Sequence, residues 1–420
     1  MSRKRHKVCL ITPNHISTNP RLVKEATALS EAGYLVHLVF SQHVTEAVRE
    51  DIKILSKNPE WTYDYLNWSD GNFKTKSWRL FSGLQQKIGS LLNKKINWLL
   101  LEKIELNRNY FFQLGAAVKS KPDFFIAHNA GALAVAGDAA ERLGCGFGFD
   151  AEDFHRGQLL PPGEKEAVIK LEDFYIKKAT YVSAASPLIA MEYDELYEIT
   201  TTVINNVFPL IKPPVEIVSE RAEALKLFWF SQSVGLDRGL QDVFAAMKKV
   251  EQLQLEFHIF GNISPSVLEE FKRLLQQLKF SDEPKVYLKG TLSPDELLHE
   301  AKNYDIGLAI EPGFCRNNEI ALSNKIFTYL LGGNAIIFSD TPAQLYFYQT
   351  NPGIGCLYKV GDHETLASHL KTYYYDRGLL QTHKQNSFLS FCEEHNWNQV
   401  KKDFLRQISS CLETKEVVAK

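Results

Sequence analysis

Apolar runs of strand length alternate with amphipathic runs of helix length along most of the chain. In the first half, the predicted strands are residues 7–12, 34–40, 123–129, 147–153, 180–186 and 201–206, and the predicted helices are 21–33, 131–144, 164–179 and 187–197. In the second half, the predicted strands are 225–231, 256–261, 285–290, 305–311, 335–340 and 354–359, and the predicted helices are 239–250, 264–278, 293–304, 323–333, 341–349 and 362–375. Alternation of this kind is typical of parallel βαβ units.

Three predicted helices of the second half begin with a hydroxyl residue followed by proline, namely Ser264-Pro265, Ser293-Pro294 and Thr341-Pro342. Each hydroxyl is expected to cap its helix, and proline suits the first turn because its missing N–H would be unpaired there anyway. Residues 144–148 (GCGFG) precede a predicted strand, so we expect a tight turn there and not a dinucleotide-binding loop.

The alternation is interrupted at the proline-rich stretch FPLIKPP. We therefore expect an α/β protein in which two doubly wound, Rossmann-like domains of similar size, joined by a short linker, face each other across a cleft. The predicted division is an N-terminal domain of residues 1–208, a linker of 209–214, a C-terminal domain of 215–377 and C-terminal helices in 378–420. The tail is predicted to be helical and continuous from Gly378 to about Leu412, and to pack back toward the N-terminal domain. Ligands of such domains bind at the carboxyl ends of the strands.

Composition and charge narrow the possible partners. The 420 residues are 45% hydrophobic and carry a formal net charge of −2, so we expect no nucleic-acid partner. The charge is uneven, because residues 72–121 hold ten basic and only two acidic residues. Within this segment, leucines and Trp98 are mixed with lysines, which fits either a solvated helix over the first domain or a surface that contacts anionic lipid.

The six cysteines are scattered, without CxxC pairs or histidines at metal-ligand spacing, so we expect reduced thiols and no metal. The apolar run near the basic start is too short for a signal peptide core, and no segment reaches the roughly 18 to 20 apolar residues of a membrane span. A cytoplasmic protein is therefore expected, with peripheral contact at the inner face of the membrane through residues 72–121 as an open alternative.

Residues 323–340 (SNKIFTYLLGGNAIIFSD) join a polar start, a short apolar helix and a strand. The first N–H groups of a helix are unpaired and carry its positive dipole end, which disfavours a lysine and favours an anion. Ser323, Asn324 and Lys325 are therefore predicted to face an anion.

Several segments occur in an informative order. The second half contains FSQSVGLDRGL (230–240), FHIFGN (257–262), VYLKGTLSPDEL (286–297), DIGLAIE (305–311) and the 323–340 stretch, and the first half contains NPRLVKEATALSEAGYLVHLV (19–39), DFFIAHNAGALAVAGDAAERLG (123–144) and the pair Asn205-Asn206. This set resembles GT-B glycosyltransferases, in particular the retaining enzymes of family 4 and close relatives. The resemblance implies transfer of a sugar from a nucleotide-sugar donor to an acceptor, with retention, in surface polysaccharide or glycolipid synthesis. It implies no metal and no cofactor besides the nucleotide sugar.

The resemblance also assigns residues to the donor. It places the diphosphate at Gly235, Arg238 and the helix start Ser323-Asn324-Lys325, the base near Leu288, Gly290 and Thr291, the ribose near Glu319, and the sugar between Glu311 and His128. Fixed cations are the main contribution expected, because the leaving diphosphate gains negative charge. Gln232 stands where the family has an arginine, so Lys325 is expected to supply the missing charge. Glu311 and Glu319 have the spacing of the family's E-x7-E signature but lie nine residues too early.

On the acceptor side, the resemblance points to His15, Asn19 and Arg21 in the first strand-to-helix loop, and to Asp153 and His155 after a later strand. The acceptor is expected to be a glycan or a lipid-linked molecule. Its hydroxyl would attack on the side from which the diphosphate leaves, with a phosphate oxygen as the base, so no side-chain nucleophile is required.

Other interpretations stay open at this stage. Arg238 is also explained as an exposed loop charge, Glu311 as a capping acid and His128 as an interior histidine. The alternative functions are a nucleotide-sugar epimerase of the same fold, a non-catalytic two-domain sugar-binding protein, and a catalytically inactive homologue. A two-domain dehydrogenase is disfavoured because residues 12–20 contain no glycine where a dinucleotide fingerprint needs one.

Overall fold

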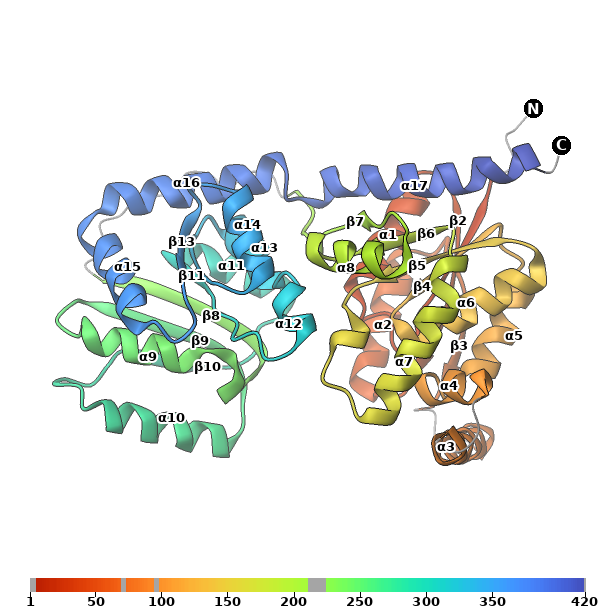
Figure 1. The fold of residues 1–420 in the computed structure, drawn as a ribbon, viewed down its shortest axis with the longest axis horizontal. Helices are drawn as coiled ribbons and strands as arrows, with labels where there is room; N and C mark the ends of the chain where they lie inside the picture. Colours follow the sequence, from red (N-terminus) through yellow and green to blue (C-terminus); the bar gives the residue numbers. More distant parts are fainter. Residues whose placement is uncertain (1–4, 69–72, 94–97, 211–223, 419–420) are drawn as a thin grey trace. The chain divides into compact units, whose positions relative to one another are not determined.

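The computed structural model describes residues 5–68, 73–93, 98–210 and 224–418 (Figure 1). The chain divides into unit 1, which comprises residues 1–205 and 401–420, and unit 2, which comprises residues 206–400. Of the predicted linker 209–214, residues 211–214 lie outside the described residues.

Unit 1 is built on a seven-stranded parallel sheet in the order β3-β2-β1-β4-β5-β6-β7. Its strands are β1 (Lys7–Ile11), β2 (Leu35–Gln42), β3 (Thr62–Asn67), β4 (Phe124–His128), β5 (Gly146–Ala151), β6 (Tyr181–Ala184) and β7 (Thr202–Val203). The predicted strands of the first half are therefore confirmed. The edge strand β3 was not predicted, because its residues are half-buried or exposed and form no apolar run.

Helices flank the sheet of unit 1 (Figure 1). They are α1 (Pro20–Glu31), α2 (Thr45–Lys57), α3 (Phe73–Asn93), α4 (Leu99–Leu106), α5 (Tyr110–Ser120), α6 (Ala130–Leu143), α7 (Pro162–Tyr175), α8 (Pro187–Tyr197) and α17 (Trp397–Val418), with short 3-10 turns η1 (His155–Gly157) and η2 (Ile176–Lys178). Gly144 ends α6 at φ 62°, a left-handed conformation that glycine adopts without strain, so the predicted tight turn before β5 is confirmed.

Unit 2 repeats this architecture around a six-stranded parallel sheet in the order β10-β9-β8-β11-β12-β13. Its strands are β8 (Leu225–Val234), β9 (Leu255–Ile263), β10 (Val286–Lys289), β11 (Ile306–Ala309), β12 (Ala335–Ser339) and β13 (Gly355–Tyr358). Its helices are α9 (Leu240–Lys249), α10 (Pro265–Leu278), α11 (Pro294–Glu300), α12 (Arg316–Ile320), α13 (Asn324–Gly332), α14 (Pro342–Thr350), α15 (His363–Tyr375) and α16 (Arg377–Glu393), with 3-10 turns η3 (Leu236–Arg238) and η4 (Ala301–Asn303). Every strand and helix predicted for the second half is present, and among the α-helices described in this half only α12 was missed.

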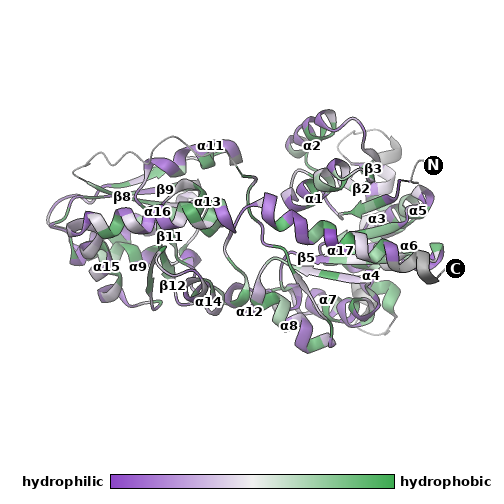
Figure 2. Cartoon of the chain, turned by 90° about the horizontal axis from the view of Figure 1, so that it is seen from above, coloured by the Kyte–Doolittle hydropathy of each residue, from purple (hydrophilic) through white to green (hydrophobic). Residues whose placement is uncertain are grey.

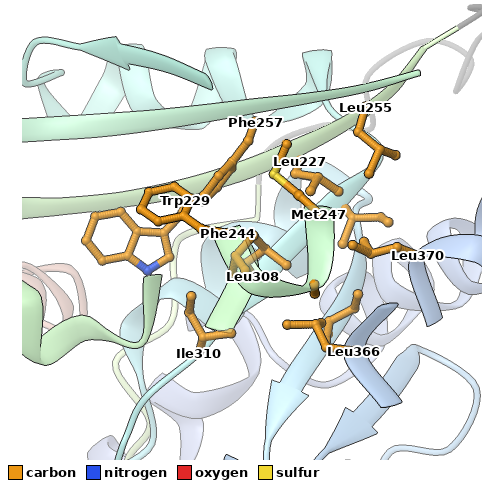
Figure 3. Packing of buried hydrophobic residues seen from close by; sticks show 14 of the residues in the cluster. Leu227, Trp229, Phe244, Met247, Leu255, Phe257, Leu308, Ile310, Leu366 and Leu370 are labelled. Carbon is orange, nitrogen blue, oxygen red and sulfur yellow. The ribbon is translucent and has the colours of Figure 1, made fainter. Parts of the chain in front are cut away.

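The hydrophobic core of unit 2 lies between its sheet and the helices α9 and α15. Figure 3 shows part of this core, in which Trp229 of β8, Phe244 of α9 and Leu366 of α15 pack together. Trp229 is fully buried and is the fifth of the ten residues of its strand. Helices such as α16 carry both hydrophilic and hydrophobic residues (Figure 2), as expected of helices that cover a sheet with one face.

Two of the three predicted helix caps are confirmed. The Ser264 hydroxyl accepts from the Val267 N–H at 3.3 Å, and Ser293 forms a capping box with Glu296. The prediction for Thr341 is wrong at the level of its side chain. Thr341 occupies the cap position of α14, but its hydroxyl is buried without a hydrogen-bond partner among the described residues.

The C-terminal tail is two helices, so the predicted continuous helix is wrong. Asn396 explains the break between α16 and α17. Its amide nitrogen donates to the Phe391 and Cys392 carbonyls at 2.9 Å, which closes α16, and its Oδ1 accepts from the Gln399 N–H at 3.2 Å, which opens α17. Helix α16 belongs to unit 2, whereas residues 401–418 of α17 belong to unit 1, where Lys401 pairs with Glu31 at 3.1 Å.

In the described part of the chain, none of the helices combines the length and the apolar character that crossing a membrane requires.

Candidate functional site

The carboxyl ends of three neighbouring strands of unit 2 enclose a hollow of about 480 Å³. Its lining consists of Val234, Ile259, Gly261, Asn262, Ile263, Leu288, Lys289, Gly290 and Thr291, from β8, β9 and β10. The structure therefore brings together the three residues predicted for the base, Leu288, Gly290 and Thr291. Gly261 has φ 150°, and a Cβ there would lie 2.4 Å from the Ser231 carbonyl oxygen, so this side of the hollow requires glycine.

The loop after β8 continues from this hollow. It runs through Gly235 and η3 to Gly239, which adopts φ 75° and precedes α9. A Cβ on Gly239 would lie 3.6 Å from the Ile310 Cβ, so the loop lies against the segment that follows β11. Glycine at these positions lets the backbone come close both to Ile310 and to the ends of the strands.

Arg238 is the cation of this loop. Its Nε is buried without a hydrogen-bond partner among the described residues, and its nearest carboxylate oxygen, Asp237 Oδ1, is 3.7 Å away. A buried guanidinium N–H normally has a partner, because leaving it unpaired costs about 1–3 kcal/mol. The side chain is therefore in place to donate to an anion at this edge of the sheet.

The start of α13 faces a carboxylate of the same unit. Lys325 Nζ donates to Glu311 Oε1 at 2.7 Å, and the Ser323 hydroxyl donates to the same oxygen at 3.2 Å. The Lys325 ammonium also lies 5.3 Å from the centre of the Trp229 ring. The cation predicted for the diphosphate and the carboxylate predicted for the sugar thus form one ion pair. Asn324, the first residue of the helix, is exposed.

Glu319 lies on the short helix α12. Its carboxylate is 3.1 Å from Arg316 Nη1, and its Cγ would lie 3.6 Å from a Cβ on Gly313. Gly313 has φ 63°, so the chain turns sharply between Glu311 and Glu319. The Glu319 side chain is 39% exposed.

In unit 1, His128 ends β4 inside a buried charge network. The side chain is fully buried, with Nε2 3.3 Å from Glu25 Oε2 and Nδ1 3.2 Å from Asp150 Oδ2. Burial alone would lower the pKa of His128, but Glu25 and Asp150 raise it well above its ordinary value. Arg21 also pairs with Asp150, and burial and Asp150 raise the pKa of Glu25. This geometry matches the interior-histidine alternative.

Glu25, His128 and Asp150 are of the residue types that bind metal ions. The ligand atoms of Glu25, His128 and Asp150 lie within 4.8 Å of one another. The Arg21 guanidinium, however, donates from Nη2 to Asp150 Oδ1 at 2.7 Å and supplies positive charge to the cluster. A metal ion would compete with both Arg21 and His128 for the same carboxylate. The predicted absence of a metal stays a prediction.

Asn129, directly after His128, has φ 69° and ψ 155°. This backbone conformation is essentially restricted to glycine and costs of order 1–3 kcal/mol in other residues. Strain of this kind clusters at functional sites, and here it falls at the carboxyl end of a central strand. Sequence reasoning missed this residue, because nothing in its neighbours signals the strain.

The residues predicted for the acceptor are mostly engaged inside unit 1. His15 Nδ1 is 2.6 Å from Asp51 Oδ2, and its Nε2 accepts from the His43 and Val44 N–H groups at 2.8 and 3.0 Å. Both ring nitrogens of His15 are therefore engaged inside unit 1. Asn19 caps α1 by accepting from the Leu22 N–H at 2.9 Å.

Of the remaining acceptor-side residues, Arg21 lies on α1, whereas Asp153 and His155 follow β5. Arg21 is buried in the charge network, and Asp153 accepts from Gln158 Nε2 at 3.1 Å. His155 opens η1 and is 6% exposed, with no partner for Nε2 in the described part of the chain. The functional roles assigned to these residues, and to those of unit 2, stay predictions.

A second hollow, of about 270 Å³, lies at the carboxyl ends of β1, β2 and β3. Its lining consists of Pro13, Asn14, His43, Trp68, Gln86, Leu106, Asn107, Arg108 and Asn109. Sequence reasoning did not single out any of these residues for binding. The sequence signal for this hollow is that His43 and Trp68 directly follow strands. It could not be used for Trp68, because the strand before it, β3, was not predicted.

No protein-family model matches the chain, and no curated protein sequence matches it. Solved structures match it over nearly its whole length. A glycosyltransferase from Rickettsia africae is 16% identical, with a TM-score of 0.68 over 98% of this chain and 99% of its own. Anabaena HepE in complex with UDP and glucose is 12% identical, with a TM-score of 0.66 over 97% and 100%. The lipopolysaccharide outer core galactosyltransferase WaaB is 15% identical, with a TM-score of 0.62 over 96% and 99%.

These neighbours are GT-B glycosyltransferases, so the predicted resemblance is confirmed at the level of the fold. The chain has a two-domain, Rossmann-like α/β fold, as predicted. Family 4 in particular stays a prediction.

Proposed function

We propose that this protein is a glycosyltransferase that moves a sugar from a nucleotide-sugar donor to a hydroxyl group of an acceptor, with retention. The observation that carries the proposal is Arg238, whose buried Nε has no partner among the described residues on a loop bracketed by Gly235 and Gly239. This loop joins a hollow large enough for a nucleoside at the carboxyl ends of β8, β9 and β10. The fold shared with HepE, whose structure contains UDP and glucose, makes UDP-sugars the first donors to test.

In this proposal, unit 2 holds the donor. The base occupies the hollow beside Leu288, Gly290 and Thr291, and the diphosphate accepts from Arg238 and from backbone N–H groups of the Gly235 loop. Lys325 and Ser323 place a second group of hydrogen-bond donors at the start of α13. Glu311, which both residues contact, accepts hydrogen bonds from hydroxyls of the sugar. Glu319 binds the ribose.

The chemical step needs electrostatic stabilisation more than a nucleophile. The acceptor oxygen forms a bond to the anomeric carbon as the bond from that carbon to the β-phosphate oxygen breaks. The acceptor oxygen attacks from the face that the diphosphate leaves, which gives retention, and the acceptor proton passes to a phosphate oxygen on that face. Negative charge then grows on the leaving diphosphate, next to Arg238 and the ammonium of Lys325. Glu311 lowers the net charge of the Lys325 site before the donor arrives.

The acceptor belongs to unit 1 in this proposal, and a lipid-linked acceptor has support from α3. Within the part of α3 whose side chains are described, Leu80, Phe81 and Leu84 are 76%, 52% and 58% exposed. Lys76, Arg79 and Lys87 lie on the same helix. An apolar surface next to basic residues suits an anionic membrane, and we extend the proposal to peripheral membrane contact during glycolipid or surface polysaccharide synthesis. Residues 94–97 of the basic segment lie outside the described residues.

The test is a product analysis. The purified chain is incubated with UDP-, GDP- and ADP-sugars, and proton and phosphorus NMR spectra are recorded over time. Release of a nucleoside diphosphate from one donor, with the sugar transferred to an added glycan or to water, supports the proposal. An epimerised nucleotide sugar without release of diphosphate supports the epimerase alternative and contradicts it.

The matched variants are Arg238→Gln and Arg273→Gln. Arg273 is an exposed arginine of α10 in the same unit, paired with Glu270. Arg238→Gln should slow diphosphate release at least about tenfold, since a charged hydrogen bond contributes about 1.5–3 kcal/mol, and Arg273→Gln should not. Equal rates in the two variants would remove Arg238 from the mechanism.

A further inference from the structure

The 270 Å³ hollow of unit 1 has features of a binding site of its own. It lies where β1, β2 and β3 end, which is the edge of a doubly wound sheet that normally receives ligands. Pro13 and Asn14 come from the first loop, His43 follows β2, and Trp68 follows β3. The opposite wall, with Arg108 and Asn109, comes from the connection between α4 and α5.

Arg108 brings positive charge to this hollow without a described carboxylate beside it. Its Nη2 donates to the Arg79 carbonyl at 2.8 Å and to the Ser82 hydroxyl at 3.3 Å, and the guanidinium carbon lies 4.2 Å from the centre of the Trp68 ring. Its Nε is buried and has no partner within the described ranges. Burial and the nearby charge of Arg79 lower the pKa of Arg108, which indicates that cations accumulate here.

Asp51, an acid whose charge acts on His43, already has partners inside the unit. Asp51 is fully buried and accepts from Ser17, from Gln42 and from the His15 ring. Its charge is therefore shared among three partners inside the unit, and Arg108 is not one of them. A bound anion would supply the missing counter-charge.

Trp68 adds a second donor that lacks a partner. It is 9% exposed, and its indole Nε1–H has no hydrogen-bond partner among the residues that the structure describes. A buried indole N–H normally finds an acceptor. Burial lowers the pKa of His43, so this ring stays neutral and donates or accepts a hydrogen bond without a charge of its own.

We propose that this hollow binds a phosphate group of the acceptor, with Arg108 Nε and Trp68 Nε1 as donors. The oxygens of one phosphate can accept hydrogen bonds from both of these unpaired donors. The planar guanidinium group also suits phosphate, because its N–H groups match the spacing of two phosphate oxygens. The volume is below the roughly 300 Å³ at which sites for drug-sized ligands begin, which favours a phosphorylated sugar unit or a lipid phosphate over a nucleotide sugar. Naming the ligand as the acceptor rests on the proposed function.

The experiment measures binding on the full chain, so that its result is independent of transfer. Isothermal titration with α-D-glucose 1-phosphate tests a soluble sugar phosphate. Co-sedimentation with phosphatidylcholine vesicles, with and without phosphatidic acid, tests a lipid phosphate. Arg108→Gln should weaken at least one of the two interactions at least about tenfold, equivalent to 1.4 kcal/mol.

Two further variants keep the result interpretable. Asn14→Asp adds a negative charge at an exposed lining position without removing any bond of Arg108, and it should weaken phosphate binding in the same direction. Arg142→Gln removes an exposed arginine elsewhere in unit 1 and should leave binding unchanged. Loss confined to the vesicle arm identifies a lipid phosphate, and loss confined to the soluble arm identifies a sugar phosphate.

The proposal is overturned if phosphate binding is absent in the wild type, or if Arg108→Gln and Asn14→Asp bind as tightly as Arg142→Gln. The same samples are titrated with UDP. GDP and ADP are titrated in the same way. Binding of any one of the three nucleoside diphosphates alongside absent phosphate binding removes this inference and leaves the proposed function in place, whereas binding of none of them to the wild type removes the proposed function itself.

Discussion

Lys325 donates to Glu311 at 2.7 Å in a pair whose side chains are only 12% and 11% exposed. The lysine stands in the first turn of α13, where the helix dipole disfavours a cation. Glu311 offsets this cost, because its carboxylate accepts from both Lys325 and Ser323 at the helix start. The Glu311 carboxylate is thus an anion at the helix start, where the sequence predicts one.

We predict that Lys325→Gln lowers the free energy of unfolding by about 1–3 kcal/mol, because it leaves the mostly buried Glu311 carboxylate with a single hydroxyl donor. Urea denaturation of Lys325→Gln, Glu311→Gln and the double variant measures this. The double-mutant cycle should give a coupling energy of at least about 0.5 kcal/mol. Strictly additive effects would show that the pair does not stabilise unit 2.

The loop of Arg238 should depend on the conformation of Gly239. Gly239→Ala places a side chain at φ 75° and should lower the free energy of unfolding by about 1–2 kcal/mol. Gly290→Ala is the matched control, since no atom lies within 4 Å of its added Cβ and its φ is not positive. Thermal melting of both variants separates them. Equal melting temperatures would mean that the left-handed conformation is not required.

Much of the fold could be predicted from the sequence, because buried parallel strands are short apolar runs and their helices carry caps and stops. The edge strand β3 and helix α2 were missed, since their exposed faces carry no apolar run. The break at Asn396 was missed for a different reason. One side chain caps two helices there, and neither proline nor glycine marks the position.

The residues of the candidate site could be predicted only where they stand at the carboxyl end of a strand. Leu288, Gly290 and Thr291 end one strand and line one hollow, as a strand-end rule predicts. The pairing of Lys325 with Glu311 could not be predicted, because it joins the first turn of α13 to the segment after β11. The same holds for the network of Arg21, His128 and Asp150, which assembles three separate elements in the interior of unit 1.

Glu172 should make the stability of unit 1 depend on pH. Burial raises the pKa of Glu172 to about 7, although Tyr193 donates to it at 2.8 Å and Arg156 Nε lies 3.0 Å away. Between the ordinary carboxyl pKa and pH 7 the folded state holds more protons than the unfolded state. The free energy of unfolding should therefore fall as the pH rises through this range, by up to about 3 kcal/mol.

Glu172→Gln isolates this effect, because it keeps the hydrogen bond with Tyr193 and removes the titrating group. Urea denaturation of both proteins between pH 5 and pH 8 gives the comparison. The wild type should lose stability relative to the variant as the pH rises. A difference that stays constant across the range would contradict the raised pKa.

The exposed face of α3 should govern membrane association. Replacing Leu80 and Leu84 by glutamine should weaken co-sedimentation with anionic vesicles at least about tenfold, since burying one leucine contributes about 1.5–3 kcal/mol. Leu389→Gln, at an exposed leucine of α16, is the control and should have no effect. Unchanged vesicle binding of the double variant would rule out α3 as the contact surface.

The central claim is that Arg238 meets the diphosphate of a nucleotide-sugar donor. The most direct test is isothermal titration of the wild type, Arg238→Gln and Arg273→Gln with whichever of UDP, GDP and ADP binds the wild type most tightly. The account predicts at least about tenfold weaker binding to Arg238→Gln, through the loss of a charged hydrogen bond, and unchanged binding to Arg273→Gln. Equal affinity in all three proteins, or no binding of any nucleoside diphosphate, would contradict it.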